Sequence, residues 1–130
     1  MTPLTTEQLV LTFWQRLSTF DFAGAGALLH DDYLGEYPQT GERIRGRANF
    51  VALNAAYPGR WVITVERIIC AGSDVVTEVT LRNSLDLDMA PVTAVSFFTI
   101  RDGAIAYERD FWPEPYTPPA DRAAWVERDA

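Results

Sequence analysis

Four long segments in the second half of the chain most constrain the fold that this sequence can adopt. They are rich in Val, Ile, Thr and Phe, and each is bounded by a turn signal: residues 61–71, 75–85, 91–101 and 104–112. This composition between turn residues is typical of β-strands. Asp102-Gly103, between the last two segments, is a strong hairpin signal. The sequence therefore predicts an antiparallel meander of four long strands after residue 60.

The first sixty residues carry helical patterns instead. Apolar residues from Leu9 to Leu17 recur at helical spacing, and Thr5 or Thr6 can cap this first helix. The pattern then predicts a second helix over 21–29, a strand over 33–39, a return strand over 42–45 and a third helix over 47–57. Helices first and an antiparallel meander later predict an α+β fold, with the three helices packed on one face of a curved sheet.

The third long strand is apolar on both of its faces. Alternation places Ala94, Phe98 and Ile100 on one face, and Val95 and Phe97 on the other. A strand that is apolar on both faces needs cover on both. A chain of 130 residues has few helices to offer, so a second copy is expected to cover the outer face. The alternative is an ordinary core strand with sparse outer packing.

Charge and cysteine content limit the expected partners and compartment. The net charge is −7 and every basic residue is an arginine, whereas nucleic acids and anionic membranes attract basic surfaces. Neither is therefore an expected partner. The single cysteine, Cys70, excludes an intramolecular disulfide and is expected to be a small core residue. The first ten residues do not resemble a signal peptide, and no apolar run reaches the roughly 20 residues that span a bilayer. The sequence therefore predicts a cytoplasmic protein.

Four motifs follow one another along the chain: Phe13-Trp14; Leu28-Leu29-His30-Asp31-Asp32-Tyr33; Glu36-Tyr37-Pro38 with the return Gly41-Glu42-Arg43-Ile44-Arg45-Gly46; and Gly103-Ala104-Ile105 with Arg109-Asp110-Phe111-Trp112. Together they resemble the SnoaL-like group, named for polyketide cyclases, of the nuclear-transport-factor-two-like superfamily. The resemblance covers residues 1–112, and it implies a cone-shaped half-barrel with a pocket at its open end and a homodimer formed through the sheet. Residues 113–130 are expected to be a Pro-rich tail of the same domain, with a short helix around 121–128.

Two acids on the last strand are the catalytic candidates. In SnoaL-like cyclases the acid at the position of Asp110 faces the pocket, so the resemblance implies an acid or base role for it. Alternation places Glu108 on the same face, and two neighbouring carboxylates push their pKa values apart, which can give one acid and one base. A desolvated carboxylate has the raised pKa that a base near neutral pH requires. The alternative is that Asp110 ends the strand at the surface or pairs with Arg82 or Arg109.

Substrate-binding candidates lie on several elements. Glu78 and Arg82 share one face of the strand over 75–85, and they line the pocket only if that face points inward. Tyr33 and Tyr37 are candidate hydrogen-bond donors to an oxyanion. His30 is the sole histidine. We expect it to interact with a helix C-terminus, and lining the pocket is the alternative. The aromatic candidates for the pocket walls are Trp14, Tyr57 and Trp112.

These residues favour a small cofactor-free acid–base enzyme of the cyclase, isomerase or hydrolase type. Its substrate would be an apolar, carbonyl-bearing small molecule, and no metal is expected. The chain lacks a Gly-rich phosphate loop, a dinucleotide motif and a G-x-S-x-G elbow. Two alternatives stay open: a non-catalytic small-molecule binder in which Asp110 is inert, and a dimeric interaction module with a filled barrel.

Overall fold

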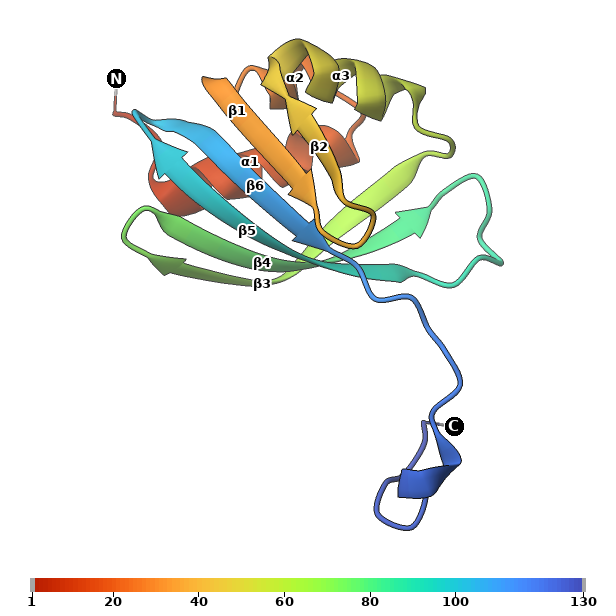
Figure 1. Ribbon diagram of the computed structural model, residues 1–130. Helices are drawn as coiled ribbons and strands as arrows, with labels where there is room; N and C mark the ends of the chain where they lie inside the picture. The colour runs from red at the N-terminus through yellow and green to blue at the C-terminus, as the bar shows by residue number, and fades with distance from the viewer. Residues whose placement is uncertain (1, 130) are drawn as a thin grey trace.

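A curved six-stranded sheet organises the part of the chain, residues 2–129, that the computed structural model describes (Figure 1). Its strands are β1 (Leu29–Tyr37), β2 (Glu42–Arg45), β3 (Trp61–Ala71), β4 (Asp74–Asn83), β5 (Val92–Arg101) and β6 (Ala104–Phe111). They lie in the order β2-β1-β6-β5-β4-β3. β1 and β6 run parallel, and the other neighbours are antiparallel. The predicted meander is confirmed, as is the mostly antiparallel α+β fold.

Three helices cover the inner face of the sheet: α1 (Thr6–Ser18), α2 (Phe22–Gly26) and α3 (Gly46–Ala56) (Figure 1). Thr5 caps α1, because its side chain accepts a hydrogen bond from the Gln8 amide while the Gln8 side chain accepts one from the Thr5 amide. The second helix is shorter than predicted. Gly24 and Gly26 weaken it, and Leu29 instead begins β1 and pairs with Ile105 of β6.

An aromatic cluster forms the centre of the core between α1 and the sheet. Phe13 is completely buried, and its ring lies 5.3–5.7 Å from the rings of Trp14, Phe50 and Phe98. These rings come from α1, α3 and β5, so the cluster joins the helical layer to the middle of the sheet. Cys70, expected in the core, is exposed instead. It lies near the end of β3, one residue before the last of that strand.

Within residues 2–129, no helix lies over the opposite face of the sheet (Figure 1). We call this surface the outer sheet face; its apolar side chains are Ile69, Val76, Val95, Phe97 and Phe111. Ile69, Phe97 and Phe111 are 57%, 45% and 37% exposed. The two-sided apolar pattern of β5 thus has cover from this chain on its inner side, and the outer side is open to solvent.

The tail extends away from the body after β6 (Figure 1). Its regular structure is a single 3₁₀ turn, Ala120–Arg122, in place of the helix predicted over 121–128. Short isolated helices are marginal in water. No residue between 119 and 129 is buried, so packing does not supply the missing stability.

Candidate active site

The inner face of β6 carries both candidate acids. Asp110 lies opposite Ser96 of β5, and Ser96 lies opposite Thr77 of β4. Glu108 lies two residues before Asp110 on β6, with Phe98 of β5 on one side and Gly35 of β1 on the other. Directly opposed residues share a face of the sheet, so these residues form two adjacent rows that face the helices.

Glu108 is held by a tyrosine from β1. Its side chain is buried, with the residue only 3% exposed, and the Tyr33 hydroxyl donates a hydrogen bond of 2.9 Å to its Oε1 atom. Gly35 leaves room for this contact: a Cβ atom there would stand 2.6 Å from the Tyr33 hydroxyl oxygen. A larger residue at position 35 would therefore displace the tyrosine.

Asp110 is held from the β5 side. The hydroxyl of buried Ser96 donates to its Oδ1 atom at 2.5 Å. In the next strand the Trp14 indole donates to the Thr77 hydroxyl at 3.1 Å, which fixes the neighbouring position of the same row. The polar groups of this row are thus partnered within an otherwise apolar interior, as buried polar groups generally are.

Burial sets the charge of the two carboxyls. It raises the pKa of Glu108 well above its usual value, and the nearby Asp110 charge raises it further, whereas the Tyr33 hydrogen bond acts in the opposite direction. Burial also raises the pKa of Asp110, but hydrogen bonds from Glu108 and Ser96 lower it. Tyr33 donates to Glu108, and Glu108 and Ser96 donate to Asp110, so this series of hydrogen bonds ends at Asp110. The shared proton therefore belongs on Glu108 and the negative charge on Asp110.

No salt bridge reaches either acid within residues 2–129. Arg109 instead lies on the outer side, with its guanidinium 5.3 Å from the Phe111 ring centre. Arg82 pairs with Val62 across β3 and β4, on the face opposite to Thr77. The structure therefore contradicts the alternative in which Asp110 pairs with Arg82 or Arg109.

Aromatic side chains lie next to the acids at the end of β1 and β6. The Tyr37 and Trp112 rings meet edge to face at 5.3 Å. Burial raises the pKa of Tyr37, and the charges of Asp110 and Glu108 raise it further, so its hydroxyl stays protonated. Burial and the same two charges raise the pKa of Tyr33. Both tyrosines are therefore hydrogen-bond donors at neutral pH.

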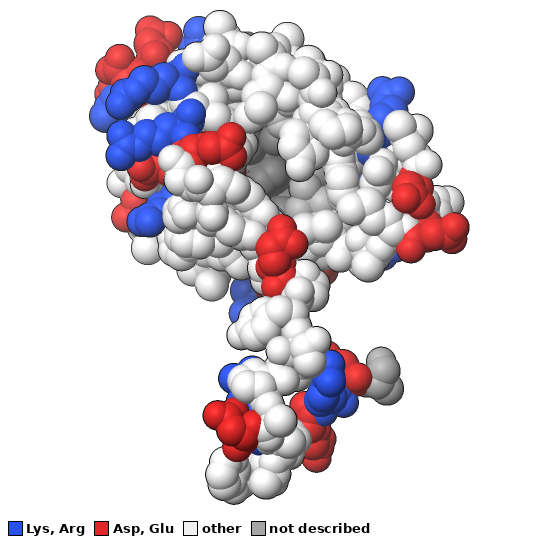
Figure 2. All heavy atoms as spheres, turned by 45° about the vertical axis from the view of Figure 1, so that its right-hand side comes forward, with Lys and Arg blue, Asp and Glu red and all other residues white. Residues whose placement is uncertain are grey.

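Tyr37 also lines a groove of about 430 Å³ between the β1–β2 hairpin and α3, together with Glu42, Arg43, Ile44, Asn49, Ala52 and Leu53. Figure 2 shows a hollow in this side of the molecule, bordered mainly by uncharged residues. A volume of several hundred Å³ is within the range of small-molecule sites. The Tyr37 side chain thus connects an accessible groove to the neighbourhood of the two acids.

The predicted site residues divide into those near the acids and those far from them. Trp14, Tyr33, Tyr37 and Trp112 lie with Glu108 and Asp110, as described above. Tyr57, at the end of α3, is 59% exposed but close enough to Tyr37 to contribute to its raised pKa.

Glu78 and Arg82 are on the other side of the sheet. Thr77 and Val79 face the core, so the intervening Glu78 faces outward, where its carboxylate lies 3.7 Å from the Arg67 guanidinium. The expected placement of Glu78 and Arg82 beside Asp110 is therefore corrected, because the inward face of β4 is the one with Val75, Thr77 and Val79.

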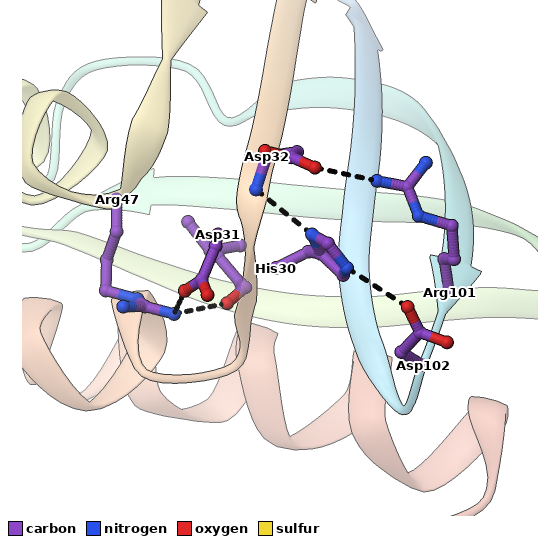
Figure 3. Close-up of polar contacts among 7 residues, drawn as sticks. His30, Asp31, Asp32, Arg47, Arg101 and Asp102 are labelled. Atoms are coloured by element: carbon purple, nitrogen blue, oxygen red, sulfur yellow. Dashed lines mark hydrogen bonds and ion pairs between the residues drawn. The ribbon is translucent and has the colours of Figure 1, made fainter.

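His30 belongs to a charged cluster at the far end of β1. Figure 3 shows its members: His30, Asp31, Asp32, Arg47, Arg101 and Asp102. The His30 ring lies 3.3 Å from Asp102 in the β5–β6 turn and accepts a hydrogen bond from the Asp32 amide. Arg47 donates to the Leu29 carbonyl and to Asp31. His30 lies in β1 rather than at the end of a helix, and its contacts join β1 to the β5–β6 turn.

Three residues of the site were not among the sequence candidates: Gly35, Thr77 and Ser96. Ser96 and Thr77 are polar residues within apolar strands, and this feature of the sequence could have identified them as site candidates. Among residues 2–129, no three His, Cys, Asp or Glu side chains are grouped so that they could hold a metal ion. In that same stretch, no helix is long and apolar enough to cross a membrane.

Comparisons with known proteins agree with this fold. A ketosteroid isomerase candidate from Kribbella flavida is 35% identical, with a TM-score of 0.87 over 96% of this chain and 90% of its own. An NTF2-like protein of unknown function from Burkholderia xenovorans is 29% identical, with a TM-score of 0.77 over 96% of this chain and 95% of its own. An LEH-like epoxide hydrolase from M. tuberculosis is 28% identical, with a TM-score of 0.70 over 83% of this chain and 82% of its own.

No curated protein matches the sequence. The family model described as the SnoaL-like domain matches residues 10–108, which includes all six strands up to Glu108. The chain therefore belongs to the SnoaL-like domain family of the NTF2-like superfamily.

Proposed function

We propose that this protein is a cofactor-free acid–base enzyme that acts on an apolar, carbonyl-bearing small molecule. The observation that carries the proposal is the buried pair of Glu108 and Asp110, which has hydrogen-bond donors around it and no cation facing it among the described residues. Perturbed carboxyls in a cleft are typical of catalytic sites. Their purely structural use would favour an arginine partner, because an unpaired buried charge is costly.

In this proposal Asp110 is the base. It removes a proton from the carbon next to the substrate carbonyl, and the C–H electron pair becomes the enolate. The Tyr37 hydroxyl donates to the enolate oxygen, since no hydrogen bond within residues 2–129 occupies it. If the substrate has a double bond next to the deprotonated carbon, the enolate is conjugated with it, and Asp110 can return the proton to the far carbon of that double bond. The isomerisation then balances without a co-reactant. Glu108 supplies a neutral acid beside the base.

Tyr33 is a positioning residue in this scheme. It is only 2% exposed and its hydroxyl is directed at Glu108, so it acts through that carboxyl rather than on the substrate. The family contains isomerases, cyclases and epoxide hydrolases, and the epoxide hydrolase similarity supports a hydrolytic variant in which Asp110 activates a water molecule. Fold alone does not select among these reactions.

We further propose that two copies associate through the outer sheet face. Its apolar side chains are exposed in the single chain, and contiguous apolar surface of this kind commonly marks an interface. The symmetric C₂ dimer is the most frequent arrangement in which one face covers its own copy.

Proton exchange tests the proposed chemistry before the natural substrate is identified. The wild-type protein is expected to catalyse deuterium uptake at the α-carbons of apolar ketones in D₂O, measured by mass spectrometry on cyclohexanone, 2-decalone and a tetracyclic ketone. Tyr33→Phe removes the hydrogen bond that favours the charged form of Glu108. The pKa of the pair should therefore rise, and the acid limb of the pH–rate profile should move to higher pH.

Tyr107→Phe is the matched control, because its hydroxyl donates to Glu36 on the outer side of the sheet. It should leave the acid limb unchanged. If none of the ketones exchanges faster than the background reaction, the enzyme proposal is wrong. A ketone that binds without exchange would then favour the non-catalytic binder.

A further inference from the structure

The C-terminal tail, residues 113–129, contributes nothing to the core of its own chain. All of its residues are exposed except Pro118, which is partly buried. Tyr116 and Trp125 are 79% and 82% exposed, and Val126 is 47% exposed. The backbone hydrogen bonds of the segment run from Ala123 to Ala120 and from Trp125 to Arg122, within the tail itself. Large aromatic side chains presented to water in this way are characteristic of a surface that binds something.

The tail nevertheless recurs in solved relatives. A match over 96% of 130 residues leaves only about five residues outside it, so the Kribbella and Burkholderia structures both match most of the tail. The epoxide hydrolase match stops at 83%. The aligned region of these two relatives thus extends into the tail, although the tail lacks packing against its own domain.

The composition of the tail explains why it does not fold back. Four prolines, Pro113, Pro115, Pro118 and Pro119, occupy its first seven residues. Such a segment favours the extended polyproline conformation, at about 3.1 Å per residue. It therefore carries the aromatic part roughly 20 Å from the end of β6, which agrees with the projecting arm in Figure 1.

The outer sheet face offers a complementary surface. A groove of about 190 Å³ on it is lined by Arg67, Ile69, Val76, Glu78 and Val95, and exposed Phe97 lies beside Val76 in the next strand. Arg67, Arg82 and Arg109 lie on the outer side of the sheet together with Glu66, Asp74 and Glu78, so these side chains balance one another in charge. The apolar groove and Phe97 therefore match the exposed aromatic side chains of the tail by apolar contact.

We propose that two copies exchange their tails, so that the segment 113–129 of each copy packs Tyr116 and Trp125 on the outer sheet face of the other. The proposal rests on the dimer proposed above and adds the tails to its interface. In a C₂ pair the exchange is reciprocal, and each tail covers apolar surface that the partner's helices leave open. The exposed tail and the exposed sheet face thereby satisfy each other.

Sedimentation of the full-length protein tests the exchange. A C₂ dimer contains two Trp125 side chains in this interface, one from each copy, and truncation of a buried interface tryptophan commonly weakens binding tenfold or more. Trp125→Ala should therefore raise the dimer dissociation constant by about 100-fold. The matched control is Leu4→Ala, a half-exposed apolar residue shortly before α1 in the sequence, which should leave the constant unchanged.

Thermal melting separates exchange from a tail that folds onto its own chain. With exchange, Trp125→Ala lowers the melting temperature of the dimer but has no effect at concentrations where the wild type is monomeric. A loss of stability that is independent of concentration would overturn the exchange. If the wild type is a dimer and Trp125→Ala has the same dissociation constant, the tail exchange is wrong but the sheet dimer stands. If the wild type is a monomer at all concentrations, both the tail exchange and the sheet dimer are wrong.

Discussion

Asp110→Asn is expected to lower turnover by about two to four orders of magnitude while the melting temperature holds or rises slightly. Asparagine retains the shape of the side chain and can still accept the Ser96 hydrogen bond, but it cannot take a proton at neutral pH. Because burial raises the pKa of Asp110, the folded state bears a cost for keeping this carboxylate charged. The amide removes that cost.

Ketone exchange and thermal melting on the same samples check both parts of this expectation. Asp88→Asn, in the exposed connection between β4 and β5, is the matched control and should change neither quantity. A buried cation that loses its partner costs about 3–5 kcal/mol. A large drop in the melting temperature of Asp110→Asn would therefore reveal a structural ion pair, and it would contradict the assignment of Asp110 as the base.

Phe13→Ala is expected to lower the free energy of unfolding by about 3–5 kcal/mol, the usual cost of replacing a buried phenylalanine with alanine. The ring is completely buried between the rings of Trp14, Phe50 and Phe98. These come from three different elements, so the cavity cannot close without moving a helix against the sheet. Urea denaturation followed by circular dichroism measures the change.

Leu11→Ala on the same helix is the control for Phe13→Ala. Leu11 is 37% exposed, so its loss should cost about 1 kcal/mol or less. Equal effects of the two substitutions would show that α1 does not pack on the sheet through Phe13. The site would then lose the support on which the Trp14–Thr77 hydrogen bond depends.

The strands of this fold could be predicted from the sequence, but their register could not. Asp102-Gly103 correctly indicates the hairpin between β5 and β6. A regular two-residue hairpin would then place Ser96 opposite Arg109. In the structure Ile100 pairs with Ile105 and Thr99 with Tyr107, so Ala106 is an extra residue. A one-residue slip moves every side chain to the other face, and this bulge is what brings Asp110 to Ser96.

The face of β4 illustrates a second limit. Its link to β5 is a connection of eight residues, 84–91, so no turn geometry fixes the register between the two strands. The composition of β4 suggested a polar inner face with Glu78 and Arg82. The structure has Val75, Thr77 and Val79 on that face, because α1 packs its aromatic side chains there. Tertiary packing decides the orientation of such a strand, and local pattern does not.

Alternation along β1 is enough to place Tyr37 and Glu36 on opposite faces of the sheet. Glu36 accepts the Tyr107 hydroxyl and contacts Arg43 on the outer side, whereas Tyr37 lies with Trp112. The direction of the Tyr33 hydroxyl was beyond the sequence, since it depends on the space left by Gly35 in the same strand. The site is thus predictable in its strands and its acids, and unpredictable in the contacts that set their charge.

Carboxyl titration tests the central claim, the shared proton of Glu108 and Asp110, most directly. Carbon-13 NMR of the side-chain carboxyls, with Glu108→Gln for assignment, should show the Glu108 carboxyl still protonated well above its ordinary pKa of 4.5. The folded state then binds more protons than the unfolded state above that pH. The free energy of unfolding of the wild type should therefore fall, relative to Glu108→Gln, as the pH rises from 4.5 toward neutrality. Two carboxyls that both titrate at or below their ordinary values, with parallel stability curves for the two proteins, would contradict the account.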